Sequence, residues 1–238
     1  MKHPILKIKN LKYSKGNKNI LDIRKLEIHR GSCYVFYGDV GSGKTTLLEI
    51  ISKNQSVSND IVYYETDDIN KISKSKYSQD ICFVPQTISR PWFKIRVEDY
   101  MLKRIKSYKH LSNPRKKLNE VINKMKLKHY LNMDFRHLSD GEKRWIQLAL
   151  SIASDTKILF IDGFGQYLGS EKINILSRIL YRKINFDGVT VIVCTHIRER
   201  LSKIASVFIR LDRGKIVSVR SHKKTSPSNR KKTPNRKK

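Results

Sequence analysis

The segment from Gly38 to Thr45 constrains the fold of this chain more than any other. It reads Gly-Asp-Val-Gly-Ser-Gly-Lys-Thr and matches the pattern G-x-x-x-x-G-K-[ST]. The continuous apolar run Cys33–Tyr37 precedes it, which is typical of a strand buried on both faces. The apolar spacing of Thr46–Ile51, directly after it, is helical. The sequence therefore predicts an α/β fold in which this loop joins a buried strand to a helix.

This glycine-rich loop has the residues needed to hold phosphate groups. Glycines let the backbone curl so that successive N–H groups point at phosphate oxygens, and the following helix adds the positive end of its dipole. Lys44 would place a positive charge on the β- and γ-phosphates, and the Thr45 hydroxyl would ligate Mg²⁺. We predict a nucleotide site formed by Gly38, Asp39, Val40, Gly41, Ser42, Gly43, Lys44, Thr45 and Thr46.

Strand-like and helical segments alternate along the rest of the chain, which indicates a largely parallel α/β sheet. Two segments near the hairpin turn Asp212-Arg213-Gly214 are expected to pair with each other, Val207–Leu211 and Lys215–Val219. The other expected strands are Ile5–Asn10, Ile20–Ile28, Ile61–Tyr64, Ile81–Val84, Ile158–Ile161 and Val189–Cys194. The expected helices lie within Val97–Met133, with a start at Pro114, and at Glu142–Ala153 and Glu171–Ile184.

Composition indicates a globular protein without a membrane span. Hydrophobic residues make up 39% and charged residues 30% of the 238 residues. No apolar run reaches the roughly 20 residues that a membrane-spanning helix needs. The start of the chain leads directly into a strand-like run, so we expect no signal peptide. The three scattered cysteines, Cys33, Cys82 and Cys194, each lie in an apolar stretch. We interpret them as unpaired thiols in a reducing cytoplasm.

The chain is strongly basic, with a formal net charge of +29 from 50 basic and 21 acidic residues. Such a charge attracts polyanions, either nucleic acid or the anionic face of a membrane. The segment Ser221–Lys238 holds eight Lys and Arg residues and no acidic or aliphatic residue, so we predict a disordered tail. Two interpretations of this tail remain open: contact with anionic lipid or nucleic acid, or a solubilising segment without a partner.

Four further segments follow the glycine-rich loop in a fixed order. Gln86 comes shortly after the strand Ile81–Val84, and Leu138-Ser139-Asp140-Gly141-Glu142 opens a helix. The apolar strand Ile158–Ile161 ends in Asp162, and His196 comes just after the next buried strand. In this order and spacing, the chain from Ile5 to about Val219 resembles the ATP-binding subunit of an ABC transporter.

The resemblance implies a P-loop NTPase core of the RecA-like type with a largely parallel sheet, an antiparallel β subdomain and a helical subdomain. We expect an ATP-binding domain over residues 1–220, with the helical subdomain at about 87–136, and a basic tail over 221–238. It also implies ATP and Mg²⁺ as cofactors.

The resemblance assigns roles to residues around the nucleotide. Tyr13 would stack on adenine, and an ordinary exposed tyrosine is the alternative. Thr45, Gln86 and Asp162 would contribute to the Mg²⁺ shell. His196 would contact the γ-phosphate, so His196 and Gln86 are the expected catalytic residues.

The segment Leu138–Glu142 resembles the signature sequence Leu-Ser-Gly-Gly-Gln. Ser139 and Gly141 are retained, and in the family they meet the γ-phosphate of ATP held by the opposite subunit. Asp140 and Glu142 depart from the pattern, and we expect the negative charge of Asp140 to weaken closure of the two subunits.

Two positions after the strand Ile158–Ile161 also depart from the family. Gly163 occupies the position of the catalytic glutamate that follows Asp162, and Gly169 replaces an aspartate that communicates across the dimer. Glycine cannot accept a proton, and general-base assistance contributes about 10²–10⁴-fold to rate. We therefore expect slow intrinsic hydrolysis that a glutamate at position 163 would raise.

The favoured function is the ATP-binding subunit of an ABC-type membrane complex on the inner face of the cell membrane. Its partners would be a separate transmembrane subunit and a second cassette, identical or different. The alternative is a soluble or cell-division-type ABC protein that acts on a macromolecular assembly or nucleic acid. The sequence leaves the transported substrate open.

Overall fold

The buried run at residues 33–37 forms the centre of a six-stranded sheet. In the computed structural model, which describes residues 3–88, 91–196 and 198–222, the strand order is β10-β9-β3-β8-β7-β6. All neighbouring strands run parallel except β10, which pairs antiparallel with β9. The strands are β3 (Cys33–Tyr37), β6 (Ile81–Val84), β7 (Ile158–Ile161), β8 (Thr190–Thr195), β9 (Val207–Asp212) and β10 (Lys215–Ser221).

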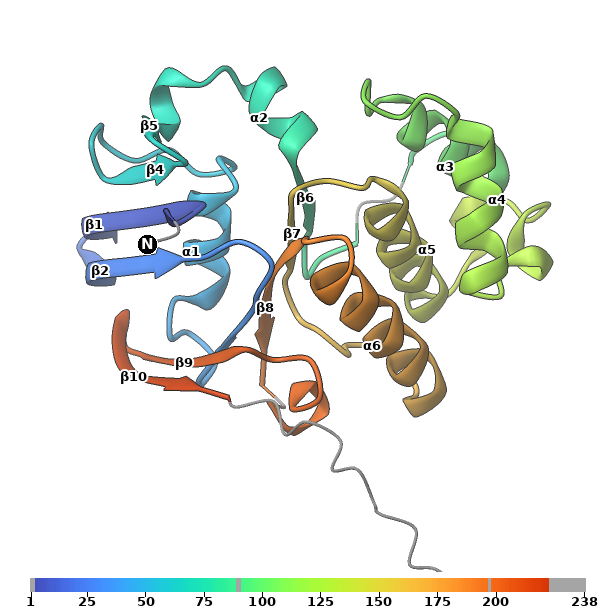
Figure 1. The fold of residues 1–238 in the computed structure, drawn as a ribbon. Helices are drawn as coiled ribbons and strands as arrows, with labels where there is room; N and C mark the ends of the chain where they lie inside the picture. The colour runs from blue at the N-terminus through green and yellow to red at the C-terminus, as the bar shows by residue number, and fades with distance from the viewer. Residues whose placement is uncertain (1–2, 89–90, 197, 223–238) are drawn as a thin grey trace, which may run out of the picture.

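A smaller antiparallel sheet has the order β2-β1-β4-β5. It consists of β1 (Leu6–Lys15), β2 (Lys18–Ile28), β4 (Val62–Tyr64) and β5 (Asp67–Asp68). Figure 1 shows helix α1 (Lys44–Ile51) between this sheet and the central sheet. The α1 side chains Leu47 and Ile51 belong to the same buried core as Ile8 of β1 and Phe160 of β7. This packing fixes the helix that follows the glycine-rich loop.

Helices α5 (Asp140–Ala153) and α6 (Ser170–Asn185) lie on the other side of the central sheet, and α3 (Val97–Lys106) and α4 (Pro114–Lys124) lie beyond α5 (Figure 1). Side chains of β3 alternate between the two cores, since Cys33 and Val35 face this helical layer while Tyr34 and Phe36 face α1. Trp145 of α5 donates a hydrogen bond of 3.0 Å to the carbonyl of Met125, which ties α5 to the end of α4.

The fold class expected from the sequence is confirmed. The expected strands lie within two residues of their expected bounds, except that β1 continues five residues further, to Lys15. Helix α4 begins at Pro114 as expected, with the side chain of Asn113 accepting a hydrogen bond from the Lys116 amide. Helix α2 (Lys74–Asp80) and the short strand β5 were not anticipated. In the segment expected to be a helical subdomain, the first helix begins at Val97. Most of the basic tail, residues 223–238, lies outside the described residues.

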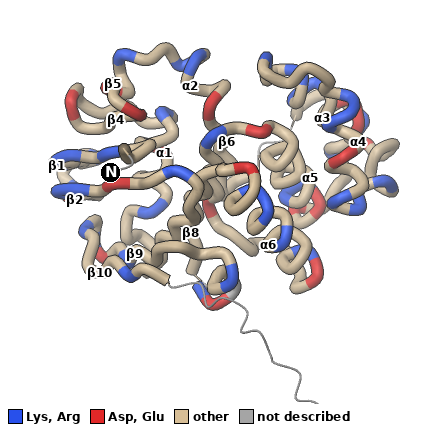
Figure 2. The backbone as a smooth tube through the Cα atoms, in the orientation of Figure 1, with Lys and Arg blue, Asp and Glu red and all other residues tan. Residues whose placement is uncertain are grey.

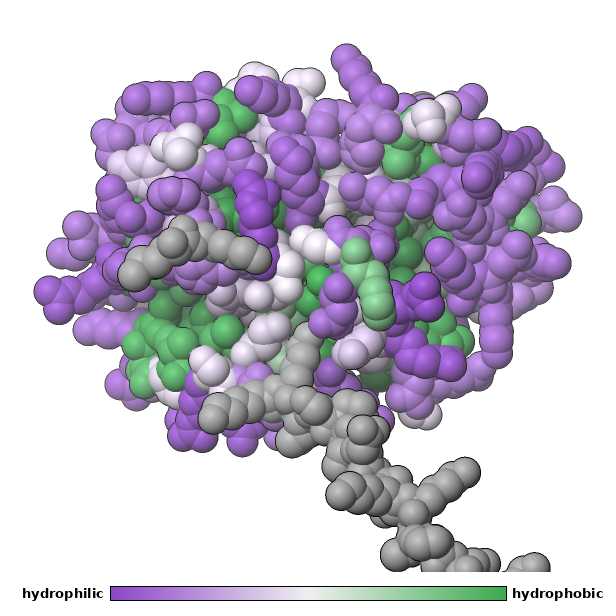
Figure 3. Space-filling view, in the orientation of Figure 1, coloured by the Kyte–Doolittle hydropathy of each residue, from purple (hydrophilic) through white to green (hydrophobic). Residues whose placement is uncertain are grey.

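Charged side chains cover much of the surface. Figure 2 shows Lys and Arg distributed over all parts of the described chain, so the basic charge does not form a single patch. The face in Figure 3 is mostly hydrophilic, with an apolar area over the β9–β10 hairpin, where Val217 and Val219 are exposed. Within the described residues, no helix has the length and apolar character needed to cross a bilayer. All three cysteines lie among the described residues, and none of them forms a disulfide there.

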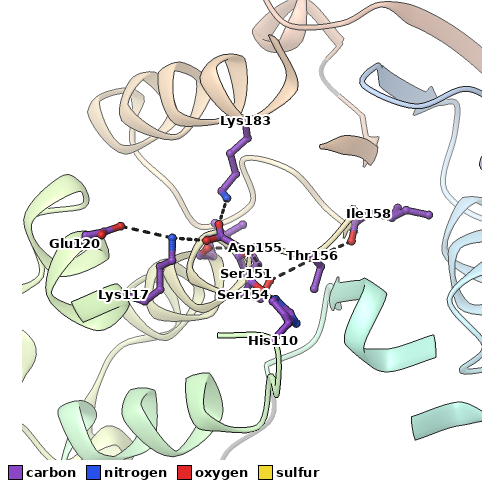
Figure 4. A network of polar contacts seen from close by, with 10 residues as sticks. His110, Lys117, Glu120, Ser151, Ser154, Asp155, Thr156, Ile158 and Lys183 are labelled. Carbon is purple, nitrogen blue, oxygen red and sulfur yellow. Dashed lines mark hydrogen bonds and ion pairs between the residues drawn. The ribbon is translucent and has the colours of Figure 1, made fainter. Parts of the chain in front are cut away.

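A network of ion pairs joins two helices and the α5–β7 connection at the edge of the sheet where β7 and β8 begin. Asp155 follows α5 and accepts hydrogen bonds from Lys183 of α6, at 2.5 Å, and from Lys117 of α4 (Figure 4). Lys117 also lies 3.5 Å from Glu120. Next to this network, the Thr156 hydroxyl donates to the Ile158 carbonyl at 3.1 Å. The network therefore links α4, the α5–β7 connection and α6 through one carboxylate.

Candidate functional site

A cavity of about 280 Å³ opens at the carboxyl ends of the central strands. It brings together the predicted residues Gln86, Asp162 and His196, which come from three different segments of the chain. The complete lining is Lys18, Ile20, Val40, Gly41, Gly43, Lys44, Thr45, Thr46, Gln86, Asp162, Gly163, Cys194, Thr195 and His196. The sequence order of the motifs thus corresponds to one site in space.

Glycines at the two ends of the loop are required by close approaches of other segments. Gly38 has a φ of +147°, and a Cβ atom there would lie 2.1 Å from the Leu211 carbonyl oxygen of β9. Gly43 has a φ of +99°, and a Cβ atom would lie 2.6 Å from the Leu21 side chain of β2. At Gly38 the conflict is with backbone, so no L side chain fits there unless the backbone shifts, and at Gly43 the positive φ disfavours every residue but glycine. The loop is therefore held between the two sheets.

Lys44 is held in place by the loop that it belongs to. Its ammonium group donates hydrogen bonds to the carbonyls of Gly38, at 2.9 Å, and Asp39, at 2.7 Å, and to the Ser42 hydroxyl at 3.0 Å. The residue is 7% exposed. Burial lowers the pKa of Lys44, although nearby negative groups, including Asp162, offset part of this effect. The charge is thus positioned within the curl of the loop.

The carboxylate of Asp162 has the properties of a metal-shell residue. Its Oδ2 atom is buried and has no hydrogen-bond partner among the described residues. Burial raises the pKa of Asp162, while a hydrogen bond from Thr45 and the charges of Arg144 and Lys44 act against the rise. Magnesium prefers oxygen ligands and keeps several waters and phosphate oxygens. The hydroxyl of Thr45, the amide of Gln86 and this carboxylate form a donor set that fits Mg²⁺.

Arg144 of α5 holds backbone next to the site without lining the cavity, and sequence reasoning missed it. Its side chain is fully buried. The guanidinium donates hydrogen bonds to the carbonyls of Pro85 and Asp162, and to that of Gly163 at 3.3 Å. Burial lowers the pKa of Arg144 to about 10. Arg144 therefore connects Pro85, the residue before Gln86, to Asp162 and Gly163, which follow β7. No motif in the sequence marks Arg144.

Gly163 adopts a backbone conformation that other residues rarely take. Its φ is +67°, and a Cβ atom there would lie 2.6 Å from Oε1 of Gln166. A glutamate at this position would combine a strained backbone with a steric conflict. Gly163→Glu would therefore require the Gln166 side chain to move, and the expectation that this substitution raises turnover stays a prediction.

The signature residues lie at the start of α5 and do not line the cavity. Ser139 caps this helix in a reciprocal arrangement with Glu142, whose carboxylate accepts hydrogen bonds of 2.7 Å from the Ser139 hydroxyl and 2.8 Å from its amide. At Gly141 a Cβ atom would lie 2.8 Å from the Tyr167 carbonyl oxygen, so the helix packs closely against the 163–169 loop. The negative charge of Glu142 therefore lies within hydrogen-bond distance of the Ser139 hydroxyl.

Other predicted residues lie at the margins. Tyr13 is in β1 opposite Leu21 and does not line the cavity, although Ile20 of the neighbouring strand does. Its role in adenine stacking stays a prediction. Gly169 is exposed, with nothing within 4 Å of the position of a Cβ atom. Gly38 and Asp39 line a second cavity of about 510 Å³, which shares His196 with the first and contains Arg198, Arg210 and Arg220.

The fold and the loop between β3 and α1 define a P-loop nucleotide-binding protein. A family model described as ABC transporter matches residues 21–163, more than half of the chain. The chain therefore belongs to the ABC transporter ATP-binding family.

Two relatives are similar over most of this chain. A putative ABC transporter ATP-binding protein of Onion yellows phytoplasma is 26% identical over 90% of the chain, which spans 37% of that protein's length. An uncharacterized ABC transporter ATP-binding protein of Methanocaldococcus jannaschii is 27% identical over 87% of this chain and 94% of its own length.

Solved structures share the fold at low sequence identity. The ATP-binding subunit of an ABC transporter has a TM-score of 0.82 at 18% identity, covering 91% of this chain and 90% of that one. The cbiO1 protein of Clostridium perfringens, part of the transporter complex cbiONQ, has a TM-score of 0.76 at 19% identity, covering 92% and 89%. A dimeric cassette with ADP and Pi bound has a TM-score of 0.78 at 23% identity, covering 91% and 98%.

Proposed function

We propose that this chain is the nucleotide-binding subunit of an ABC-type membrane complex, which uses ATP with Mg²⁺ to act on a separate membrane protein. The observation that carries the proposal is the cavity that joins the glycine-rich loop to Gln86, Asp162 and His196. Family membership supports it.

In this proposal, the triphosphate lies along the loop between β3 and α1. Lys44 would exchange its hydrogen bonds to loop carbonyls for phosphate oxygens, and His196 would face the γ-phosphate. Thr45, Gln86 and Asp162 would hold Mg²⁺, which neutralises charge on the phosphates. Since Gly163 has no side chain, the chain supplies no carboxylate base at the position next to Asp162, and we propose slow hydrolysis.

A second cassette is needed to complete the site. Ser139 and Gly141 do not line the cavity of their own chain, so we propose that they meet the nucleotide held by a second cassette, identical or different. The dimer described for one structural neighbour supports this arrangement. We also propose that residues 1–220 form the ATP-binding domain and that residues 87–136 form its helical part.

The surface beside Gln86 suits a docked partner. A groove of about 430 Å³ lies between the α1–α2 region and α3, and Arg104 and Tyr100 of α3 line it. In the segment between Gln86 and α3, Trp92 is 90% exposed and packs edge-on against Phe93, with ring centroids 5.6 Å apart. Exposed aromatic rings of this kind are enriched at protein interfaces. We propose that a membrane subunit docks here, which would place the chain at the inner face of the membrane.

The proposal is tested by purification of the full chain from native membranes in mild detergent. We expect a membrane protein to co-purify with the wild type and with Lys116→Glu, an exposed change on α4. The Arg104→Glu variant, an equal charge reversal in the groove, should lose that protein while keeping ATP affinity.

Recovery of the wild type without any membrane protein would contradict the proposed partner. Recovery with nucleic acid instead would favour a soluble protein that acts on nucleic acid. Failure of the wild type to bind ATP, measured by calorimetry, would contradict the nucleotide site itself.

A further inference from the structure

The space beside Gly163 is occupied by another side chain. A Cβ atom at position 163 would lie 2.6 Å from Oε1 of Gln166 and 3.2 Å from Cγ of Gln86. Gly163 and Gln86 both line the nucleotide cavity. The carboxamide of Gln166 therefore lies directly behind Gly163, where the side chain of residue 163 would begin, although Gln166 itself does not line the cavity.

The loop after Asp162 is shaped to return Gln166 to this place. The backbone N–H of Gln166 donates a hydrogen bond of 3.1 Å to the Gly163 carbonyl, which closes a tight turn. The Phe164 amide donates to the Cys194 carbonyl at 2.9 Å, and the buried Phe164 side chain anchors the turn in the core. Gly165, with a φ of +81°, lets the chain reverse. The glutamine is thus placed by covalent and packing constraints.

The amide oxygen of Gln166 retains an unused acceptor. It is buried, and no described residue donates a hydrogen bond to it. Buried polar atoms almost always have a partner, so an exception calls for an explanation. A turn of the Gln166 side chain past Gly163, which has no side chain of its own, would bring this oxygen to a water molecule in the cavity.

We infer that Gln166 is a positioning residue that orients the attacking water in ATP hydrolysis, in place of a carboxylate at position 163. The inference rests on the proposed function, because it requires ATP in the cavity. The amide oxygen would accept a hydrogen bond from the water, and glutamine has a comparable role in other nucleoside triphosphatases.

The reaction balances without a base on the protein. The water oxygen forms a bond to the γ-phosphorus, and the bond between this phosphorus and the β–γ bridging oxygen breaks. The electron pair of the broken bond stays on the β-phosphate of ADP. The second proton of the water passes to an oxygen of the released phosphate or to solvent. Orientation without proton removal accounts for a slow reaction, since the glutamine amide takes no proton.

The test compares full-length wild type, Gln166→Ala, Gln166→Glu and the control Gln55→Ala, which changes a glutamine on the loop after α1, outside the cavity lining. For each, ATP affinity is measured by calorimetry and turnover by phosphate release with saturating ATP and Mg²⁺. We expect Gln166→Ala to lower kcat on the order of 10²-fold, because the attacking water would no longer be held in position. The Kd for ATP should stay within about twofold of the wild-type value. Gln55→Ala should match the wild type.

The pH–rate profile of Gln166→Glu distinguishes a role in catalysis from a purely structural role. The variant should have a higher kcat than the wild type. Its kcat should also rise with pH as the new carboxylate ionises, a dependence that the wild type lacks. If Gln166→Ala does not fold, as judged by thermal unfolding, Gln166→Asn replaces it, because its amide is one methylene short and should also lose turnover.

Unchanged kcat in the alanine or asparagine variant would overturn the inference, as would a wild type that binds ATP without hydrolysing it. A wild type that does not bind ATP is a different result, since it would contradict the proposed function itself.

Discussion

Replacement of Asp155 by asparagine is expected to lower the free energy of unfolding by about 2 kcal/mol. The carboxylate accepts hydrogen bonds from Lys183, whose side chain is 9% exposed, and from Lys117, whose side chain is 25% exposed. Hydrogen bonds to charged groups are each worth about 1.5–3 kcal/mol, and loss of one partner of a buried ion pair costs about 3–5 kcal/mol. Because the Asp155 side chain is 33% exposed, we reduce the expected cost for solvent screening.

The substitution is otherwise conservative. Asp155 has a φ of +46°, a conformation that asparagine tolerates as well as aspartate does, so no backbone strain is added. For a chain of this length, each kcal/mol shifts the melting temperature by about 2–4 °C, which predicts a decrease of roughly 4–8 °C. Urea denaturation and thermal unfolding at pH 7 measure the two quantities.

The pH dependence gives a second check. Burial raises the pKa of Asp155, but the hydrogen bonds and charges of Lys117 and Lys183 together hold it below its usual value. A lowered pKa means that the carboxylate stabilises the fold fully above the unfolded pKa of about 3.9, and that this contribution is lost as the pH falls through the lower folded pKa. The stability difference between wild type and Asp155→Asn should be constant from about pH 7 to 5 and should shrink below about pH 4.

The matched control is Glu171→Gln, which breaks an ion pair with Lys126 whose side chains are 75% and 71% exposed. Exposed pairs contribute about 1 kcal/mol or less. If Asp155→Asn were no more destabilising than this control, or if its effect grew toward low pH, the reasoning about the network would be wrong.

Three further results are expected at the nucleotide site. Lys44→Ala should weaken ATP binding sharply, because the loop loses its positive charge, and equal affinities in calorimetry would contradict the site. Glu142→Gln keeps the helix cap but removes the negative charge beside Ser139, so the fraction of dimer formed with ATP and Mg²⁺ should rise in analytical ultracentrifugation. An unchanged or smaller fraction of dimer would refute this. Gly163→Ala should lower the free energy of unfolding by about 1–2 kcal/mol, from its left-handed conformation and its conflict with Gln166, and a urea midpoint equal to that of wild type would exclude that strain.

The sequence predicted the parts of the fold that depend on short-range pattern. The apolar run at Cys33–Tyr37 indicated a strand buried on both faces, and the alternation of its side chains between two cores agrees with that. Helix α2 was missed because Tyr77 is its one buried residue, so the segment has no apolar periodicity to detect.

In the candidate site too, the residues that belong to short motifs were predicted, and those that depend on the tertiary structure were not. Lys44, Asp162 and His196 were found because their chemistry is recorded in motifs, and the structure brings them to one cavity. Arg144 was missed because a basic residue next to Lys143 on an amphipathic helix normally faces solvent, whereas here it is buried on backbone carbonyls. The conformation of Gly163 could not be predicted either, because it depends on the turn that returns Gln166.

The hydrogen bonds that Lys44 makes within its own loop have a consequence for the thermodynamics of nucleotide binding. Because the ammonium group is already fixed by the carbonyls of Gly38 and Asp39, the loop acquires its order when the protein folds. Phosphate then replaces one set of acceptors with another, so little conformational entropy is lost at that moment. We expect the entropy change on binding to be dominated by the release of water and counterions, with the loop itself contributing little.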